Sequence, residues 1–353
     1  MWFTKQYKTG ALEDLRTSED KEKDFLYKEI ATAPYVEWRE KPMCEWRSFP
    51  KQDQKGVGSC VSHSLTKILG IENWLEENTY LKLNPLYIYT HRVNYPNDGM
   101  NANDALTLAS TIGSPLYDLF PVKFTEQEAL ALKNYPIPES FKTIAKLYKG
   151  GGFVYLNPAN IDEIANIIHS RKKGVLLFFR FGPENNWWSP EPKFTETKNW
   201  KYRHAVVGID FTLINGKKYI IIDDSSGPET GFDKNGRRKI SEEWFNGQDC
   251  WVSAYLEDFA NKKLETETTL PKYQWNRDLS VGSSGEDVKM LQTVLSMIWD
   301  DNGSLFPLVQ FPTGLFYGMT RSAVKRFQIK YGITPAEGYF GPITREKLNS
   351  MCK

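Results

Sequence analysis

The sequence predicts an α+β protein in which a helical region comes first, a β-rich region follows, and a small helical domain ends the chain. Apolar residues recur at helical spacing after Cys60, with Val61, Leu65 and Ile68 on one stripe. Continuous apolar runs, typical of buried strands, come later in the chain. With 353 residues the chain is long enough for two domains.

The punctuation of the chain suggests where the domains begin and end. Residues 1–45 are polar and contain prolines, which predicts an extended lead-in that wraps the main domain. The main domain is expected over residues 46–260. A polar stretch then predicts a linker over residues 261–278, followed by a small domain over residues 279–353.

Two periodicities predict the elements of the main domain. Helical spacing covers residues 60–77, 85–94, 102–111 and 161–171. Runs rich in Val, Ile and Phe predict strands over residues 175–181, 204–214 and 218–223. The segment between the first two strands contains Trp187, Trp188 and Trp200 and is too polar for a strand. We expect it to be a loop that flanks a cleft.

Composition excludes several classes of function. A net charge of +1 gives no electrostatic basis for nucleic-acid binding. No stretch resembles a transmembrane helix, and the N-terminus lacks the apolar core of a signal peptide. The four cysteines, Cys44, Cys60, Cys250 and Cys352, show no CxxC spacing, so neither a disulfide framework nor a zinc site is indicated. We expect four free thiols and a reducing origin.

Cys60 has the surroundings of a thiol nucleophile. A cysteine at a helix start lies beside free backbone N–H groups and the positive end of the helix dipole, which both favour the thiolate. Gly56 and Gly58 precede it and allow a substrate to approach the backbone. Gln54 could place an amide donor where an oxyanion would form.

A histidine should accept the thiol proton, and the chain has four. His91 and His169 lie in helical patterns, where a packed or surface role is the default. His63 comes three residues after Cys60, but helix geometry would hold it inward rather than across an open cleft. His204 opens a buried strand, and we therefore expect it to be the base.

A third group should orient the imidazole, and Asp224 ends the strand that returns to His204 across Asn215–Gly216. A two-residue turn would put Asp224 on the opposite face from His204. A three-residue turn would shift the pairing by one and put both side chains on one face. We therefore expect a bulged turn. A strand-end Asp-Ser turn without any chemistry is the alternative.

These pieces, in this order, resemble the papain family of cysteine peptidases. Residues 53–60, Asp-Gln-Lys-Gly-Val-Gly-Ser-Cys, follow the nucleophile motif Gln-Gly-x-Cys-Gly-Ser-Cys of that family. The run His-Ala-Val from His204 is shared, and residues 224–227, Asp-Ser-Ser-Gly, stand where the family has Asn-Ser-Trp-Gly. The resemblance implies a papain-like fold, with a helical subdomain and an antiparallel β-barrel-like subdomain on either side of the active-site cleft.

The resemblance also implies roles for individual residues. It makes Cys60 the nucleophile, His204 the base, Asp224 the orienting group and Gln54 an oxyanion donor, with no cofactor or metal. Substrate contacts are expected at Gly58, Ser59 and Gly99. Ser226 replaces a tryptophan that shields the histidine pair in the family, which predicts a wetter pair and an altered pH profile.

The C-terminal segment carries an internal repeat. Gly-x-Phe-x-x-x-Thr-Arg occurs at residues 314–321 and again at 338–345, and each threonine, Thr320 and Thr344, is expected to cap a helix. With a helix beginning near Asp287, this predicts a three-helix module whose inward residues include Ala323, Val324, Phe327 and Leu348. The segment resembles the peptidoglycan-binding domain of cell-wall enzymes. A helical module that has lost its affinity for glycan, or that binds another protein, is the alternative.

Together these patterns predict a cysteine peptidase that acts on peptide or protein substrates and is directed to peptidoglycan by its C-terminal module. One alternative is a peptidoglycan endopeptidase or amidase of the phage-lysin or tail-associated type. Another is a structural or adhesion protein that keeps the peptidase fold only as a scaffold. Without a signal peptide, the expected location is the cell envelope or a virion, reached by lysis or by non-classical export.

Overall fold

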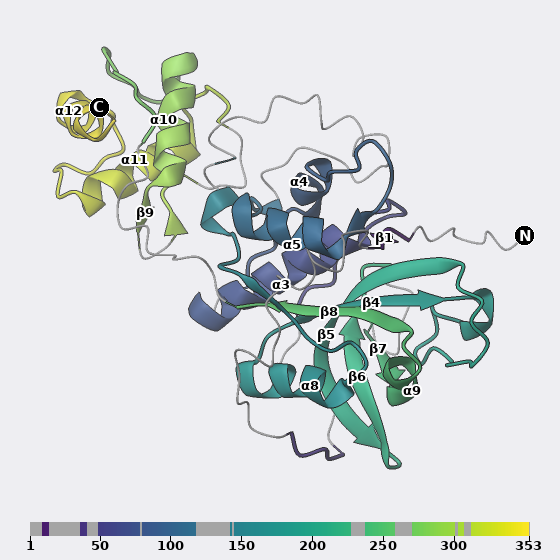
Figure 1. The fold of residues 1–353 in the computed structure, drawn as a ribbon. Coiled ribbons are helices and arrows are strands. Elements are labelled where there is room, and N and C mark those ends of the chain that lie inside the picture. Colours follow the sequence, from purple (N-terminus) through teal and green to yellow (C-terminus); the bar gives the residue numbers. More distant parts are fainter. Residues whose placement is uncertain are drawn as a thin grey trace, which may run out of the picture. The chain divides into compact units, whose positions relative to one another are not determined.

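The computed structural model describes residues 9–13, 36–40, 49–77, 80–117, 142, 145–226, 237–257, 270–300, 303–306 and 312–352. The chain forms two compact units (Figure 1). The main unit contains the described residues up to Tyr117 and from Ala145 to Glu257, and the C-terminal unit contains those from Leu270 onward. No helix within these described ranges has the length and apolar character needed to cross a membrane.

The helical part of the main unit consists of α3 (Cys60–Glu77), α4 (Pro85–Thr90) and α5 (Ala102–Thr111). Helix α3 has the predicted bounds, and its apolar stripe is fully buried. Helix α4 begins where the side chain of Asn84 accepts hydrogen bonds from two backbone N–H groups, but it ends four residues earlier than predicted. In the segment after it, the guanidinium of Arg92 donates to backbone carbonyls instead.

The β-rich part is a six-stranded antiparallel sheet in the order β3-β8-β4-β5-β6-β7. The three predicted strands correspond to β4, β5 and β6. The sequence patterns did not indicate the other three. The bounds are β3 (Phe153–Tyr155), β4 (Val175–Phe181), β5 (Tyr202–Ile214), β6 (Lys217–Asp223), β7 (Arg237–Ser241) and β8 (Cys250–Leu256).

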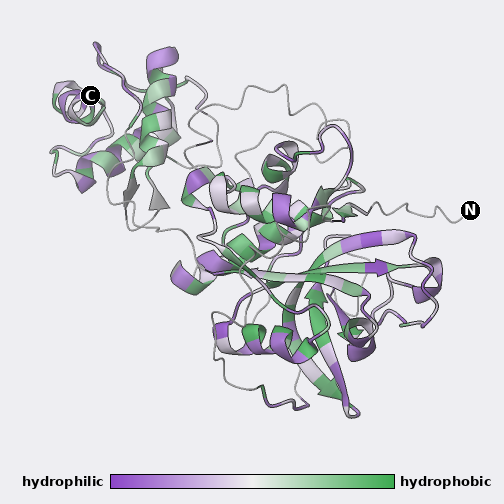
Figure 2. Ribbon diagram, in the orientation of Figure 1, coloured by the Kyte–Doolittle hydropathy of each residue, from purple (hydrophilic) through white to green (hydrophobic). Residues whose placement is uncertain are grey.

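Short elements surround this sheet. The predicted helix over residues 161–171 is an α-helix, α8 (Ile161–Asn166), that continues as a turn of π-helix over Ile167–Arg171. A 3₁₀ turn (Pro183–Asn185) and α9 (Glu242–Asn246) lie elsewhere along the chain. In Figure 2 the strands β5 and β6 are largely hydrophobic, whereas α8 alternates between hydrophobic and hydrophilic residues, as expected for a helix with one buried face.

Helix α3 packs closely on the sheet. A Cβ atom added to Gly174, just before β4, would lie 3.0 Å from side-chain atoms of both Ile71 and Val207. The contact leaves no room for a side chain at this position. Because α3 begins at Cys60 and β5 contains His204, this packing fixes the distance between the thiol of Cys60 and the imidazole of His204.

The predicted one-residue shift between β5 and β6 is present, but the turn does not produce it. The turn has two residues, Asn215 and Gly216, with φ angles of 50° and 77°, and Ile214 pairs with Lys217. The predicted three-residue turn is therefore wrong. The register shifts further along the strands, between Gly208 and Asp210, where β5 contains one extra residue. This bulge supplies the one-residue shift that brings Asp224 to the same face as His204.

The C-terminal unit is built from α10 (Glu286–Met297), α11 (Gly318–Lys330) and α12 (Pro342–Met351), with a small antiparallel pair of strands, β9 (Trp299–Asp300) and β10 (Gly303–Ser304). The residues predicted to face inward are buried in its core. Trp275 and Leu279 belong to the same core. The last part of the segment expected to be a linker therefore packs as part of this unit.

The repeat in the C-terminal unit has a structural cause other than the predicted helix caps. Helix α11 is capped at Tyr317 and α12 at Gly341, so both threonines lie inside their helices. Each threonine instead accepts a hydrogen bond from a buried glutamine amide. The pairs are Gln292 with Thr320 at 2.8 Å and Gln328 with Thr344 at 3.0 Å.

The same two glutamines complete a second set of contacts. Gln292 Oε1 accepts from the backbone N–H of Gly314 at 3.0 Å, and Gln328 Oε1 accepts from that of Gly338 at 2.8 Å. Each amide also donates to the carbonyl of the residue after the glycine. One glutamine therefore ties a turn to the helix that follows it, and the chain uses this arrangement twice.

We predict that Gln292→Leu destabilises the C-terminal unit. The change leaves the Gly314 N–H and the Thr320 hydroxyl without this partner, and each buried polar group left unsatisfied costs about 1–3 kcal/mol. Hydrogen exchange followed by mass spectrometry should show lost protection in α10 and α11. Gln274→Leu, at an exposed position in the same unit, is the control and should leave protection unchanged. Equal protection in both variants would contradict the structural role of Gln292.

Candidate active site

Cys60 is the first residue of α3, and its side chain is fully buried. Burial alone would raise the pKa of the thiol. The attraction and hydrogen bond of His204 act against it, together with hydrogen bonds from the backbone of Ala205 and Gly10, and the net result is a lowered pKa. The surroundings of Cys60 therefore favour the thiolate, which is the nucleophilic form.

His204 connects the thiol to Asp224. Its Nε2 lies 3.0 Å from Asp224 Oδ1, and both side chains are fully buried. Ser226 supports this pair, because its backbone N–H donates to the same Oδ1 at 2.7 Å and its hydroxyl lies 3.2 Å from Nε2. Since Nε2 is occupied in this way, Nδ1 is the ring nitrogen left for Cys60.

The far side of the pair is closed by residues that the sequence patterns did not assign to the site. The guanidinium of Arg238, on β7, contacts Asp224 Oδ2 and donates to the carbonyl oxygen of Trp187. The rings of Trp187 and Trp188 stand edge-on to the imidazole of His204, at 6.3 and 5.5 Å between centroids. The expectation of a wetter pair is wrong, because these two tryptophans cover it in place of the one missing at Ser226.

Gln54 joins the nucleophile loop to the strand end that carries Asp224. Its Oε1 accepts from the hydroxyl of Ser225 at 2.7 Å, and its Nε2 donates to the carbonyl of Val57 at 2.9 Å. The backbone N–H of Gln54 also donates to the Ser225 carbonyl at 2.8 Å. These bonds hold the buried amide of Gln54, six residues before Cys60. In this arrangement its Nε2 donates to the backbone carbonyl of Val57.

The proposed substrate contacts differ in what surrounds them. Ser59 is buried, and its hydroxyl lies 3.1 Å from His63 Nδ1, so its side chain faces inward. A Cβ added to Gly58 would lie 3.4 Å from Asp98 and from the hydroxyl of Tyr89. Gly99 has a φ of +84°, which favours glycine. All three residues are buried, and substrate contact at Gly58, Ser59 and Gly99 stays a prediction.

The other three histidines are held by local contacts. His63 Nδ1 lies 2.9 Å from the carbonyl of Ser59, and burial lowers the pKa of this imidazole to about 4. His91 Nδ1 lies 2.7 Å from the carbonyl of Tyr87, and His169 stands edge-on to Phe211. His204, by contrast, has its Nε2 3.0 Å from Asp224 Oδ1.

The chain's own N-terminal segment lies beside Gly58 and the thiol of Cys60. Strand β1 (Ala11–Leu12) pairs in parallel with β2 (Met100–Asn101), and the N–H of Met100 donates to the carbonyl of Gly10 at 2.7 Å. A Cβ on Gly10 would lie only 1.9 Å from the carbonyl oxygen of Gly58. Together with the Gly10 backbone contact to the thiol, this places Gly10 against both Gly58 and Cys60.

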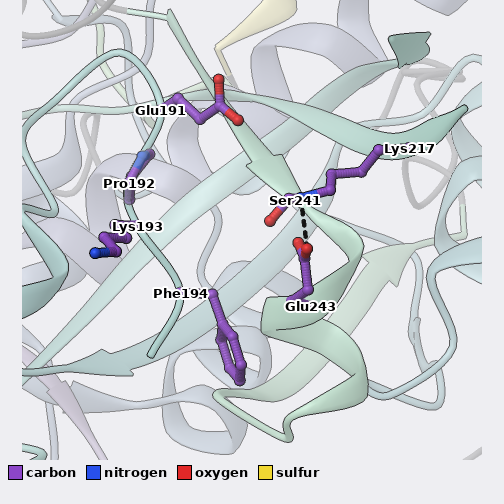
Figure 3. Close-up of a pocket in the computed structure, with 7 residues that line it drawn as sticks. All are labelled: Glu191, Pro192, Lys193, Phe194, Lys217, Ser241 and Glu243. Atoms are coloured by element: carbon purple, nitrogen blue, oxygen red, sulfur yellow. Dashed lines mark ion pairs between the residues drawn. The ribbon is translucent and has the colours of Figure 1, made fainter. Parts of the chain in front are cut away.

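A separate hollow of about 360 Å³ lies near Lys217, at the end of β6 opposite to Asp224 (Figure 3). Its charged side chains pair with each other or with neighbours, since Lys217 lies 2.5 Å from Glu243 and Glu191 lies 2.7 Å from Lys239. Its lining contains no cysteine or histidine. The lining residues are Glu191, Pro192, Lys193, Phe194, Lys217, Ser241 and Glu243.

The described side chains form neither a cluster that could bind a metal ion nor a disulfide. Within the described ranges, no group of three or more His, Cys, Asp and Glu side chains is arranged to hold a metal ion. Cys60, Cys250 and Cys352 are buried free thiols, and Cys44 lies outside the described residues. Burial raises the pKa of the Cys352 thiol to about 11, in the opposite direction from Cys60.

Known proteins resemble the two units separately. Residues 284–348 match the family described as "Putative peptidoglycan binding domain". No curated protein matches the chain by sequence. Among solved structures, xylellain, a cysteine protease from Xylella fastidiosa, superimposes with a TM-score of 0.55 at 18% identity, over 72% of this chain and 97% of its own.

Two further solved structures are similar at lower scores. The bromelain protease from Ananas comosus has a TM-score of 0.48 at 15% identity, over 60% of this chain and 94% of its own. Digestive procathepsin L 3 of Tenebrio molitor larval midgut has a TM-score of 0.48 at 18% identity, over 63% of this chain and 72% of its own. The chain thus combines the papain-like cysteine protease fold, as the sequence predicted, with a C-terminal segment that matches a peptidoglycan-binding family.

Proposed function

We propose that the protein is a cysteine peptidase in which Cys60, His204 and Asp224 form the catalytic triad. The observation that carries this proposal is the thiol at the start of α3, whose pKa is lowered by an imidazole that a buried carboxylate holds at 3.0 Å. A buried thiol without such a partner has a raised pKa, as at Cys352. The contrast supports a nucleophilic role for Cys60.

In the proposed mechanism the Cys60 thiolate attacks the carbonyl carbon of a peptide bond. His204 holds the thiol proton and returns it to the leaving amine, while Asp224 keeps the imidazole in one orientation. The backbone N–H of Cys60 and the amide of Gln54 would stabilise the oxyanion. For this the Gln54 amide must exchange its bond to Val57 for one to the substrate. Water then hydrolyses the thioester and releases the acid product.

The C-terminal unit supports a role at the bacterial cell wall. Its match to a peptidoglycan-binding family favours peptidoglycan as the surface to which the peptidase is held. A module of this kind raises the concentration of the active site near its substrate without changing the chemistry. Wall stem peptides would then be the nearest substrates, so a peptidoglycan endopeptidase is the second candidate function.

The triad is tested by single substitutions. We expect Cys60→Ala and His204→Ala each to lower kcat for a peptide library by at least about 10³-fold, because both remove a reacting group. His63→Ala should cost far less, since His63 bonds to its own helix. Circular dichroism checks that each variant is folded. A larger loss with His63→Ala than with His204→Ala would contradict the choice of base.

A thiol-directed activity probe separates an enzyme from a scaffold. We expect labelling at Cys60 in a folded chain from which residues 1–13 have been removed, and none at the buried Cys250 or Cys352. Absence of labelling in a folded chain from which residues 1–13 have been removed would favour the scaffold alternative.

We predict that the N-terminal segment inhibits the enzyme and that Gly10→Ala relieves the inhibition. The added methyl group meets the backbone of Gly58, and overpacking of this kind costs about 1–3 kcal/mol, so β1 should leave the cleft more often. The expected result is a severalfold rise in kcat/KM for a small peptide. Gly152→Ala, where a Cβ meets nothing within 4 Å, is the control and should leave kcat/KM unchanged. An equal response of both variants would contradict the inhibitory role.

The wall-binding role predicts a difference between soluble and insoluble substrates. A chain ending at residue 260 should keep its turnover of a soluble peptide, because every proposed catalytic group precedes that point. It should be lost from the pellet when sedimented with purified peptidoglycan, whereas the full chain should be retained. If both proteins sediment equally, peptidoglycan is not the ligand of the C-terminal unit.

A further inference from the structure

Arg238 is a charged side chain that the structure buries completely beside the triad. Its guanidinium contacts Asp224 Oδ2 and the carbonyl oxygen of Trp187. Its central carbon lies 5.3 and 5.4 Å from the ring centroids of Trp187 and Trp188. A buried cation is costly unless an anion compensates it, and Asp224 supplies that anion.

The two oxygens of Asp224 face different partners. Oδ1 accepts from the backbone of Ser226 and lies 3.0 Å from His204 Nε2, while Oδ2 is taken by Arg238. The carboxylate therefore cannot rotate without losing contacts on both sides. The Asp224–Arg238 pair also has no net charge, which is the electrostatic condition of a neutral amide at this position.

We propose that Arg238 is a positioning residue of the triad, which fixes Asp224 and cancels its charge so that His204 meets a nearly neutral hydrogen-bond acceptor. The inference rests on the proposed peptidase function and adds a fourth member to its triad. It accounts for an aspartate where the sequence resemblance leads one to expect asparagine. Asparagine needs no counter-charge, whereas a fully buried aspartate does.

Other charged groups near this site have partners of their own. Asp223, the neighbour of Asp224, lies 2.7 Å from Lys67 on α3. Arg237 stands opposite Asp223 in the register of the β6–β7 ladder. Exposed Arg203, next to His204, lies 2.6 Å from Glu13.

Two titratable groups on α3 also interact with His204. They are Cys60, by a direct hydrogen bond, and His63, whose interaction with His204 is weaker than its hydrogen bond to the Ser59 carbonyl. Arg238 is therefore the cation assigned to Asp224, and removing it should leave one uncompensated negative charge beside His204.

The test uses substitutions that change the charge in opposite directions. Arg238→Met leaves Asp224 negative and should favour protonated His204, which moves the alkaline limb of the kcat/KM pH profile upward by about one pH unit or more. Asp224→Asn leaves Arg238 positive and should move the limb downward by a similar amount. The double variant Asp224→Asn/Arg238→Met is neutral again and should return the limb close to that of the wild type.

Two further variants keep the test decisive. Arg238→Lys retains the positive charge and should keep the limb near its wild-type position even if the Trp187 contact is lost. The double variant Glu72→Gln/Lys173→Met removes another buried ion pair of the main unit, 2.6 Å long, which contacts no triad residue. It should leave the limb in place. If either single variant fails to fold, Arg238→Lys and the neutral double variant carry the comparison.

The rate of Cys60 alkylation by iodoacetamide against pH gives a readout that needs no peptide substrate. If the wild type reacts only as an ordinary thiol, the proposed peptidase function fails. If the wild type shows a reactive thiolate at acidic pH but the alkaline limbs of the kcat/KM profiles coincide in all variants, the function stands and the role of Arg238 is overturned. A double variant whose limb lies no nearer the wild type than those of the single variants would also overturn it.

Discussion

One extra residue in β5 determines whether His204 and Asp224 meet. With a regular ladder running back from the two-residue turn, His204 and Asp224 would lie on opposite faces of the sheet. The bulge between Gly208 and Asp210 shifts the pairing by one and brings both to one face, 3.0 Å apart. Ser226, Arg238 and the two tryptophans contact His204 or Asp224. Their contacts therefore also depend on the shift, because the shift decides which face of the sheet these two residues share.

Much of the fold could be predicted from the sequence, because its signals are local. Helix α3 follows directly from an uninterrupted apolar stripe, and β4, β5 and β6 follow from long apolar runs. Strand β7, Arg-Arg-Lys-Ile-Ser, has no such run and is defined by its pairing with β6. Local patterns do not contain that information.

The candidate site was predictable to the same extent. Cys60 and His204 stand out by residue type and position, and Asp224 by its distance along a returning strand. Arg238 does not stand out, because its contact with Asp224 depends on the placement of β7. The tryptophans that cover His204 were visible as an aromatic loop, but nothing in the sequence says which face they cover. The position of the bulge was also beyond reach, since a bulge and a longer turn produce the same shift.

Three ion pairs of the main unit hold buried charges in the same way. Asp223 pairs with Lys67 at 2.7 Å and Glu72 with Lys173 at 2.6 Å, and Asp224 has Arg238. Each pair joins segments that are distant in sequence. Removing one partner leaves the other charge buried without compensation, which typically lowers the free energy of unfolding by about 3–5 kcal/mol. Such pairs specify which segments meet more than they add to stability.

The glutamine arrangement of the C-terminal unit has a consequence for reading related sequences. Its glutamine and threonine side chains and its glycine N–H groups are occupied by contacts within the unit, so the repeat reports that the module folds and carries no information about its ligand. Positions between the repeated residues, such as Leu315, Tyr317, Tyr339 and Ile343, are exposed. Selection can change them without disturbing the scaffold. Two modules with identical repeats could therefore recognise different surfaces, and only the intervening side chains would tell them apart.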